Sequence, residues 1–420
     1  MKKILALVLV LALIAGFAAC TNDTPAPAPP APDPTDTATP APAPVEVDPD
    51  AEEITLVVWE SLDGPDEFIR QAGAAFNAIH PHITVEFVNV ELGDAATQIA
   101  LDGPGGVGPD LFVAGHDRMG DLVYGQHVAP LDASYLSNIL AGSLMAVTFN
   151  DQVYGFPISA ETYGLFYNRA LVDTPPTTWE GVVEFARDFN AENPGQYGFV
   201  MATGNSYYSI LFTSSENNML FGPDGTDATD SRLNSPESIA GLEFFQSLRE
   251  ILPVAAGDLD DGTVDDIFVA GQAAMHITGP WNIMRFRDEG LDFGVTTLPS
   301  LPGNNTPAMS FSGTRTMYLS NYSLNKEAAE LFGRFVISPE MQALRYEITG
   351  ALPTIAMELG GEFGEWANGI LEQLAFSYPM PSIPAMGRFW DVMGDAFSAV
   401  WDGADIQETM DTANTAIVGG

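Results

Sequence analysis

Two short apolar runs with a polar interruption between them constrain the fold of this chain more than any other stretch. Gly155–Ile158 and Tyr163–Tyr167 each have the composition of a β-strand, and Ser159–Thr162 between them is polar. We interpret the stretch as a single chain that passes out of one lobe and into another. Glu161 would then face the space between the lobes, although the pattern fits a solvated loop carboxylate equally well.

A helix is predicted soon after this crossing. Pro175 and Pro176 end the extended segment. Thr177, with Glu180 three residues later, has the spacing of a capping box. The chain therefore changes from extended to helical structure as it enters the second lobe.

Length and charge set broad limits on the fold and the partners. A chain of 420 residues is too long for one ordinary core, so two or three domains are expected. The formal net charge of −41 argues against a nucleic-acid partner and against docking on anionic lipid through charge. Such a surface fits a soluble domain in a salty or extracellular setting, but it does not identify a ligand.

The first residues have the features of an export signal. Lys2 and Lys3 precede an apolar run, Ile4–Phe17, which is short for a membrane span, so residues 1–19 are predicted to be a signal peptide. Cys20 is the only cysteine, which excludes disulfides within the chain. Its position resembles a bacterial lipoprotein site, with Phe17 in place of the usual Leu. That resemblance implies a lipidated Cys20, carrying fatty acyl chains such as palmitate, at the mature N-terminus; ordinary cleavage leaving a free thiol is the alternative.

Residues 20–53 form a predicted tether between that anchor and the folded part. Thr21–Glu53 is rich in Pro, Ala, Asp and Thr and cannot bury enough apolar surface to fold. Pro-rich linkers favour extended polyproline II, which gives a reach of roughly 100 Å at about 3.1 Å per residue. The folded part would thus stand away from the outer face of the cell membrane.

The folded part begins with the pattern of a βαβ unit. Ile54–Trp59 reads as a buried strand, Pro65 opens an amphipathic helix, and Ile83–Phe87 alternates like a second strand. Ligands of open α/β sheets bind beyond the carboxyl ends of the strands. The polar loop Glu60–Gly64, at such an end, is therefore a candidate binding segment.

A glycine-rich stretch follows but lacks the context of a nucleotide site. Gly103–Gly108 matches G-x-G-x-x-G, yet it follows a predicted helix at about 94–101 and precedes a strand, Leu111–Ala114, so we interpret it as a turn. Gly115–Arg118 lies at the carboxyl end of that strand. The five histidines never form H-x-x-x-H, which makes a zinc site improbable.

Beyond the crossing the strand and helix pattern resumes. Ser235 and Ser338, each followed by Pro, are predicted N-caps, and a pair of helices closes the chain. The acidic run Asp258–Asp266 fails the calcium-loop pattern and reads as a solvated face. Predicted strands are Phe199–Ala202, Ala273–Ile277 and Gly294–Leu298, and Ser310–Leu319 is predicted to be a second crossing. The whole pattern predicts two α/β lobes joined by several crossings.

Five stretches, in order, carry a family resemblance. They are GPDLFVAGHDRMG, YGFPISAETYGLFYNRALVDTPPTTWE, FVAGQAAMHITGPW, FGVTTLPSLPG and SIPAMGRFW. The chain from about Ile54 to Ile417 resembles the extracellular solute-binding proteins of ABC sugar importers, of the maltose- and maltodextrin-binding kind. The resemblance implies a periplasmic-binding-protein-like α/β fold, with the ligand in a cleft between two hinged lobes and with permease subunits as partners. The expected lobes are residues 54–160 plus 314–357 and residues 161–313 plus 358–418.

The resemblance also implies a set of ligand contacts. They are Asp63, Asp117, Arg118, Glu161, Tyr207, Trp281 and Trp390. Their chemistry suits a sugar, whose flat C–H faces stack on aromatic rings and whose hydroxyl groups pair with carboxylates and guanidinium groups. Trp281 and Trp390 would be the stacking platforms; core packing is the alternative for each.

Four positions depart from the maltodextrin-binding pattern. Ala114 stands where those proteins have a stacking Trp, Gly64 replaces a Lys, and Gly394 replaces an Arg. Asn205 and Ser206 replace a Glu-Pro pair. These departures weigh against maltose itself and leave an oligosaccharide as the expected ligand.

Three function classes remain open at this point. A binding protein for an importer has no catalytic residues, no metal and no cofactor, and its ligand could still be a non-sugar solute such as an amine. A secreted glycosidase needs two placed carboxylates, which Asp63, Asp117 and Glu161 could supply, but the resemblance is to a non-catalytic family. A lipoprotein that presents its ligand to a membrane sensor is the third class.

Overall fold

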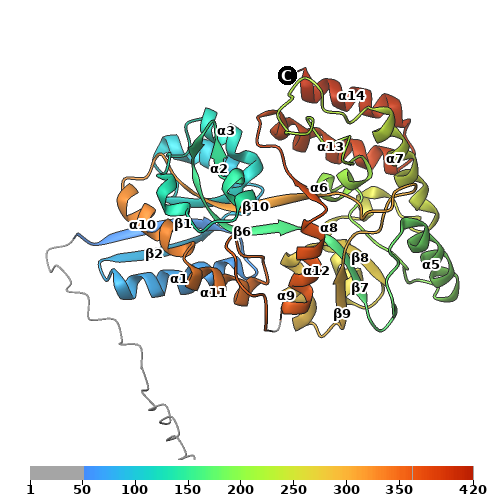
Figure 1. Ribbon diagram of the computed structural model, residues 1–420, viewed down its shortest axis with the longest axis horizontal. Coiled ribbons are helices and arrows are strands. Elements are labelled where there is room, and N and C mark those ends of the chain that lie inside the picture. The colour runs from blue at the N-terminus through green and yellow to red at the C-terminus, as the bar shows by residue number, and fades with distance from the viewer. Residues whose placement is uncertain (1–51, 362, 420) are drawn as a thin grey trace, which may run out of the picture. The chain divides into compact units, whose positions relative to one another are not determined.

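The computed structural model describes residues 52–361 and 363–419 (Figure 1). The predicted signal peptide, Cys20 and nearly all of the predicted tether lie outside these residues. Within them, no helix is long and apolar enough to cross a membrane.

The first lobe is built on a mixed sheet with strand order β10-β3-β1-β2, in which β6 also pairs with β10, and β11 extends the sheet along Ser310–Ser312, the second-lobe end of β10. β1 runs parallel to β2 with Ile54 opposite Ile83, which confirms the predicted βαβ unit. β3 is parallel to β1, whereas β10 is antiparallel to both β3 and β6. The strands are β1 (Ile54–Glu60), β2 (Ile83–Asn89), β3 (Leu111–Gly115), β6 (Gly155–Thr162), β10 (Ser310–Leu319) and β11 (Ser377–Pro379).

Helices and a small hairpin surround this sheet. A hydrophobic core forms between the sheet and its helices, with Phe68, Phe76 and Phe332 fully or almost fully buried. The helices are α1 (Pro65–Ile79), α2 (Ala95–Asp102), α3 (Met119–Tyr124), α4 (Ala141–Ala146), α10 (Lys326–Val336) and α11 (Pro339–Thr349), and the hairpin is β4 (Thr148–Phe149) with β5 (Gln152–Val153). The Gly103–Gly105 segment is a short 3₁₀ turn after α2, which agrees with its interpretation as a turn.

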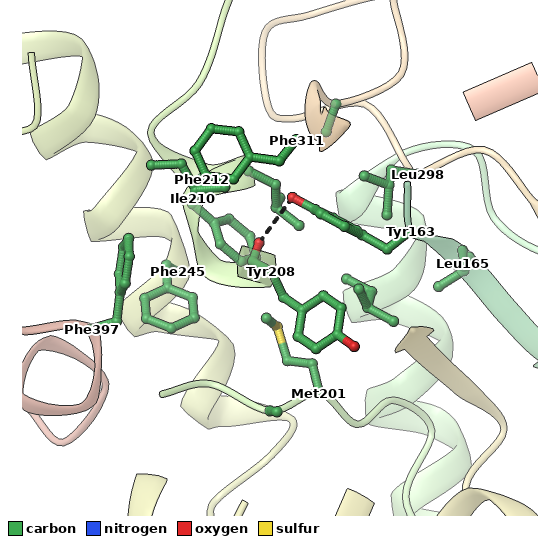
Figure 2. Close-up of a cluster of buried hydrophobic side chains, with 14 of the residues drawn as sticks. Tyr163, Leu165, Met201, Tyr208, Ile210, Phe212, Phe245, Leu298, Phe311 and Phe397 are labelled. Atoms are coloured by element: carbon green, nitrogen blue, oxygen red, sulfur yellow. Dashed lines mark hydrogen bonds between the residues drawn. The ribbon is translucent and has the colours of Figure 1, made fainter. Parts of the chain in front are cut away.

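The second lobe has a three-stranded antiparallel sheet of order β8-β7-β9. Its strands are β7 (Gly164–Asn168), β8 (Met275–Thr278) and β9 (Phe293–Thr296). Its helices are α5 (Trp179–Glu192), α6 (Ser206–Ser209), α7 (Pro236–Ser247), α8 (Asp261–Val269), α9 (Ile283–Asp288), α12 (Gly364–Leu374), α13 (Ala385–Trp401) and α14 (Ile406–Val418). Figure 2 shows part of its aromatic core, where the Tyr163 hydroxyl donates to the backbone oxygen of Tyr208 at 3.4 Å.

Two long antiparallel strands, β6 and β10, run from the first lobe into the second (Figure 1). The bounds of β10 are those predicted, but the predicted polar break at Ser159–Thr162 is wrong, because β6 continues to Thr162. β10 supplies the missing partners: the Thr162 hydroxyl, for example, donates to the Phe311 carbonyl at 2.7 Å. The expected lobe boundaries at 160/161 and 313/314 fall within these two strands, and the exact bounds stay a prediction.

Two other local expectations are wrong. The N-cap of α5 is Thr178, whose hydroxyl accepts from the Gly181 amide at 3.2 Å, so the capping box at Thr177 does not form. Phe199–Ala202 is not a strand; this segment makes one isolated bridge, between Val200 and His276. The predicted N-caps Ser235 and Ser338 are confirmed, since each side chain accepts from an amide of the first turn.

Candidate functional site

A cleft of about 1250 Å³ lies between the two lobes. All seven expected contact residues line it: Asp63, Asp117, Arg118, Glu161, Tyr207, Trp281 and Trp390. They come from loops after β1 and β3, from β6, and from α6, the loop after β8, and α13. The fold thus brings the seven residues together, and their contact with a ligand stays a prediction.

The first lobe presents two carboxylates from the carboxyl ends of parallel strands. Asp63 follows β1 and has a left-handed backbone, with φ of 62°, directly before α1. Asp117 follows β3, and its carboxylate lies against the backbone at Gly115. A Cβ at position 115 would be only 2.3 Å from Asp117 Oδ1. Both positions match the expectation that ligands bind at this edge of the sheet.

The second lobe presents the aromatic side of the cleft. Tyr207 lies with its ring centroid 6.1 Å from that of Trp281 and 6.2 Å from that of Phe311. The Trp281 residue is 38% exposed and Trp390 is half-buried, so neither is an enclosed core residue. The Trp390 Nε1 donates to Asp117 Oδ2 at 2.9 Å, which joins two of the expected contacts across the cleft.

Glu161 lies on β6 and not in a solvated loop. Its side chain is partly buried, and the Ser159 hydroxyl donates to its Oε1 at 3.2 Å. Burial, together with the charge of Glu161, raises the pKa of Tyr207 well above its ordinary value, so this phenol stays protonated and can donate. A carboxylate acceptor and a phenol donor therefore line the same cleft.

A buried charge cluster beneath the cleft was not predicted. Glu60 is fully buried, and the Arg315 Nε donates to its Oε1 at 3.0 Å. The Arg315 Nη2 bonds the same oxygen and the Ser61 hydroxyl. Arg345 lies on the other side of Glu60, with its Nη1 3.9 Å from Oε2. The sequence placed Glu60 in the candidate loop, but it gave no signal for Arg315, which is 255 residues away, or for Arg345.

The acidic run Asp258–Asp266, before and within α8, is not wholly a solvated face. Asp261 accepts at both oxygens from the Asn205 Nδ2, at 3.0 Å each, and lines the cleft. Asp265 is buried and accepts from the His276 Nε2 and the Asn282 Nδ2, each at 2.8 Å. The solvated-face interpretation is thus wrong for Asp265, which α8 turns toward the sheet, whereas Asp261 is exposed at the edge of the cleft.

His116 has a structural position beside the cleft. Its Nδ1 accepts from the Thr314 amide at 3.1 Å, and its Nε2 donates to the Met380 carbonyl at 3.0 Å. Burial lowers the pKa of this imidazole, which is therefore neutral. Among the described residues no group of three or more His, Cys, Asp or Glu side chains could hold a metal ion.

The charge around the cleft is unbalanced. Seven carboxylates line it, at Asp63, Glu91, Asp117, Glu161, Asp261, Asp265 and Asp288, against four guanidinium groups, at Arg118, Arg285, Arg315 and Arg345. Arg315 is paired with Glu60, and Arg285 with Asp266. The excess of negative charge disfavours an anionic ligand, whereas hydroxyl groups can both donate to the carboxylates and accept from the guanidinium groups.

Comparison with known proteins places this architecture in a family. Residues 59–343 match the family described as bacterial extracellular solute-binding protein. A galactooligosaccharide-binding protein of Bacillus subtilis (strain 168) is 28% identical over 85% of this chain and 87% of its own length. A maltooligosaccharide ABC transporter solute-binding lipoprotein of Streptococcus pneumoniae (strain ATCC BAA-255 / R6) is 28% identical over 79% of this chain and 81% of its own.

A solved structure supports the same assignment. The crystal structure of a cyclo/maltodextrin-binding protein complexed with maltotetraose is similar with a TM-score of 0.73 and 30% sequence identity. The similarity covers 86% of this chain and 96% of that one. The two chains therefore share one α/β fold. The family match spans well over half of the sequence, and the chain therefore belongs to the bacterial extracellular solute-binding protein family.

Proposed function

We propose that this protein captures an oligosaccharide in the cleft between its lobes and delivers it to the permease of an ABC transporter. The observation that carries the proposal is the meeting of two kinds of surface in one cleft. Trp281, Tyr207 and Trp390 offer aromatic groups, and Asp63 and Glu161 offer carboxylates. A sugar ring needs both, because it has apolar faces and a rim of hydroxyl groups.

The relatives support a saccharide as the ligand class. Their names give galactooligosaccharide and maltooligosaccharide as ligands, and the similar crystal structure holds maltotetraose. The carboxylate excess of the cleft disfavours acidic saccharides and is compatible with neutral ones.

Binding without turnover is part of the proposal. A glycosidase needs one carboxyl group free to give a proton and a second one placed as base or nucleophile. Here Asp117 is engaged by the Trp390 indole, and Glu161 accepts from the Ser159 hydroxyl. These bonds suit fixed acceptors, and the relatives are named as binding proteins.

A thermal-shift screen of the purified full-length protein tests the ligand class. The panel contains maltotriose, maltotetraose, a galactotriose and spermidine as a cationic non-sugar. A ligand that binds only the folded state stabilises it by about 2.7 kcal/mol at a hundredfold excess over Kd. We expect one or more neutral saccharides to raise the unfolding temperature. If spermidine alone raised the unfolding temperature, the ligand would be an amine and not a saccharide.

Glu161→Gln separates binding from catalysis. This variant keeps the shape of the side chain and loses its charge, so it should bind the stabilising saccharide more weakly and remain folded. Chromatography after long incubation with the wild type should recover the saccharide unchanged. Cleavage by the wild type that disappears in Glu161→Gln or in Asp117→Asn would show an enzyme.

We further propose that Cys20 is lipidated and anchors the protein to the outer face of the cell membrane. The pneumococcal relative is named a lipoprotein. Cys20→Ser should move the protein from the membrane fraction to the soluble one on fractionation of expressing cells. A Cys20→Ser protein that remained with the membrane would require another anchor.

A further inference from the structure

One cation at the base of the cleft lacks the partners that a buried charge needs. Arg345, in the second half of α11, is 2% exposed at its side chain and lines the cleft. Its Nε and Nη1 are covered by protein and have no hydrogen-bond partner. Nη2 is therefore the nitrogen through which this guanidinium can face the cleft.

The nearby carboxylate does not satisfy Arg345. The Glu60 Oε1 is taken by Arg315, and the free Oε2 stays 3.9 Å from Arg345 Nη1, too far for a hydrogen bond. That Oε2 is itself buried without a partner. The guanidinium carbon lies 5.1 Å from the centroid of the Phe68 ring, which gives a weak cation–π contact only. Burial lowers the pKa of Arg345 to about 10, which agrees with incomplete pairing.

A buried ion with unpaired hydrogen-bond donors costs free energy, and pairing any remaining accessible donor reduces that cost. Native structures seldom leave such groups unpaired. Protein covers Nε and Nη1, and Arg345 lines the cleft, so Nη2 is the nitrogen that a molecule in the cleft can pair. Thr349, one turn further along α11, also lines the cleft, and a Cβ at Gly64 would lie 3.5 Å from its Cγ2, so α11 packs directly against the Asp63 loop.

We propose that Arg345 determines specificity in the cleft by donating a hydrogen bond from Nη2 to a hydroxyl oxygen of a neutral saccharide, while Glu161 accepts from a hydroxyl of the same ring. The proposal rests on the proposed function and adds a contact that the sequence did not indicate. Glu161, Arg315 and Arg345 line the same cleft, and Ser159, whose hydroxyl donates to Glu161, lies opposite Arg315 in the β6–β10 pair. Adjacent hydroxyl groups on a sugar ring supply the acceptor and the donor that this pair requires.

A hydroxyl fits this position better than a carboxylate. Arg345, Arg315, Glu60 and Glu161 together are neutral, so an anionic group would add an unpaired charge to a buried cluster. Asp63, Glu91 and the other carboxylates of the cleft would repel it further. A saccharide that carries uronic acids should therefore bind more weakly than its neutral counterpart.

Isothermal titration of the full-length protein with maltotriose, maltotetraose, galactotriose and trigalacturonate tests the proposal. Arg345→Gln removes the cation, and Arg345→Lys keeps it with a different shape. Arg334→Gln is the matched control, because Arg334 lies over the Tyr135 ring beside Glu330 on α10 and does not line the cleft. We expect a loss of tenfold or more with Arg345→Gln, a smaller loss with Arg345→Lys, and no change with the control.

The outcomes separate the two proposals. Wild type that binds none of the neutral saccharides would overturn the proposed function and this inference with it. Wild type that binds one of them, with equal affinity in Arg345→Gln, would overturn only the inference, as would a preference for trigalacturonate. A crystal structure of the wild-type complex decides the matter if Arg345→Gln fails to fold. A sugar oxygen within about 3.2 Å of Arg345 Nη2 is the expected result, and a water molecule alone at that nitrogen would refute it.

Discussion

Trp390 and Asp117 hold one another in place across the cleft. The indole N–H of Trp390, from the second lobe, donates to the Asp117 carboxylate of the first. This bond leaves one oxygen of Asp117 for other donors and fixes the plane of the indole ring. Trp281 packs instead against Gly279. A Cβ at position 279 would lie 2.1 Å from the indole ring, so only a glycine there leaves room for it.

The two functions of Trp390 can be separated by substitution. Trp390→Ala removes the aromatic face and should weaken binding of the stabilising saccharide at least tenfold, as should Trp281→Ala. Trp390→Phe loses the bond to Asp117 and part of the ring but keeps an aromatic face, so its loss should be smaller than that of Trp390→Ala. Titration calorimetry measures all three.

Trp366→Phe is the control for the lost indole N–H. The Trp366 Nε1 donates to the Phe293 carbonyl at 3.0 Å, away from the cleft. This variant should bind the saccharide like the wild type. If Trp390→Ala and Trp281→Ala both bound the saccharide normally, the ligand would have to bind elsewhere in the molecule.

At the scale of elements, α7 approaches its neighbour through a glycine. A Cβ at Gly241 would lie 1.7 Å from the backbone oxygen of Phe212, and a backbone atom cannot move aside as a flexible side chain can. Leu242 and Phe245 are buried on the same helix. The absence of a side chain at position 241 thus sets the distance between α7 and the chain segment after α6.

Gly241→Ala should lower the unfolding temperature by several degrees. Overpacking of this kind costs about 1–3 kcal/mol. Gly142→Ala, in α4, is the matched substitution, because a Cβ there meets nothing within 4 Å and alanine is the better helix former. Calorimetry should show Gly142→Ala at or above the wild type, and equal unfolding temperatures for the two variants would contradict the steric argument.

His116 joins three elements and makes their junction sensitive to acid. Its ring connects the end of β3 to Thr314 of β10 and to Met380, which follows β11. Its pKa is lowered by burial, so below about pH 6.5 the unfolded chain takes up a proton that the folded chain does not. The free energy of unfolding therefore falls as the pH decreases from 6.5 toward the lowered pKa.

His116→Gln can keep both hydrogen bonds without titrating in this range. We expect its unfolding temperature to fall less between pH 7 and pH 5 than that of the wild type. His82→Gln, at a partly exposed position just before β2, is the control and should follow the wild type. An identical pH profile for His116→Gln would show that this imidazole does not carry the effect.

At the scale of the whole molecule, the two lobes have separate cores. Phe68 and Phe332 belong to one cluster of buried hydrophobic side chains, and Phe245 and Trp401 to another. The long pair β6 and β10 connects them, with a register shift between Arg315 and Thr316. A few residues in these crossings could change conformation while both cores stay intact.

The lobes should therefore close on the bound saccharide. Small-angle scattering should give a smaller radius of gyration for the full-length protein at saturation than without ligand. The double variant Trp281→Ala with Trp390→Ala, at the same saccharide concentration, serves as the control. An unchanged radius for the saturated wild type would argue against hinge closure.

The sequence by itself determined the local elements. The apolar run and alternation of the first βαβ unit, the bounds of β10, and the N-caps Ser235 and Ser338 all depend on neighbours a few residues away. The resemblance located seven residues that share one cleft. Both kinds of information are carried by short stretches of sequence.

Only the tertiary structure decided which polar residues become buried partners. The polar stretch Ser159–Thr162 was predicted to interrupt a strand, because the sequence does not show that its hydrogen-bond partners lie on β10, about 150 residues away. Glu60, Arg315 and Arg345 come from three distant segments, so spacing along the chain could not indicate that they meet. A buried charge depends on what surrounds it in space, and that surrounding exists only after the chain has folded.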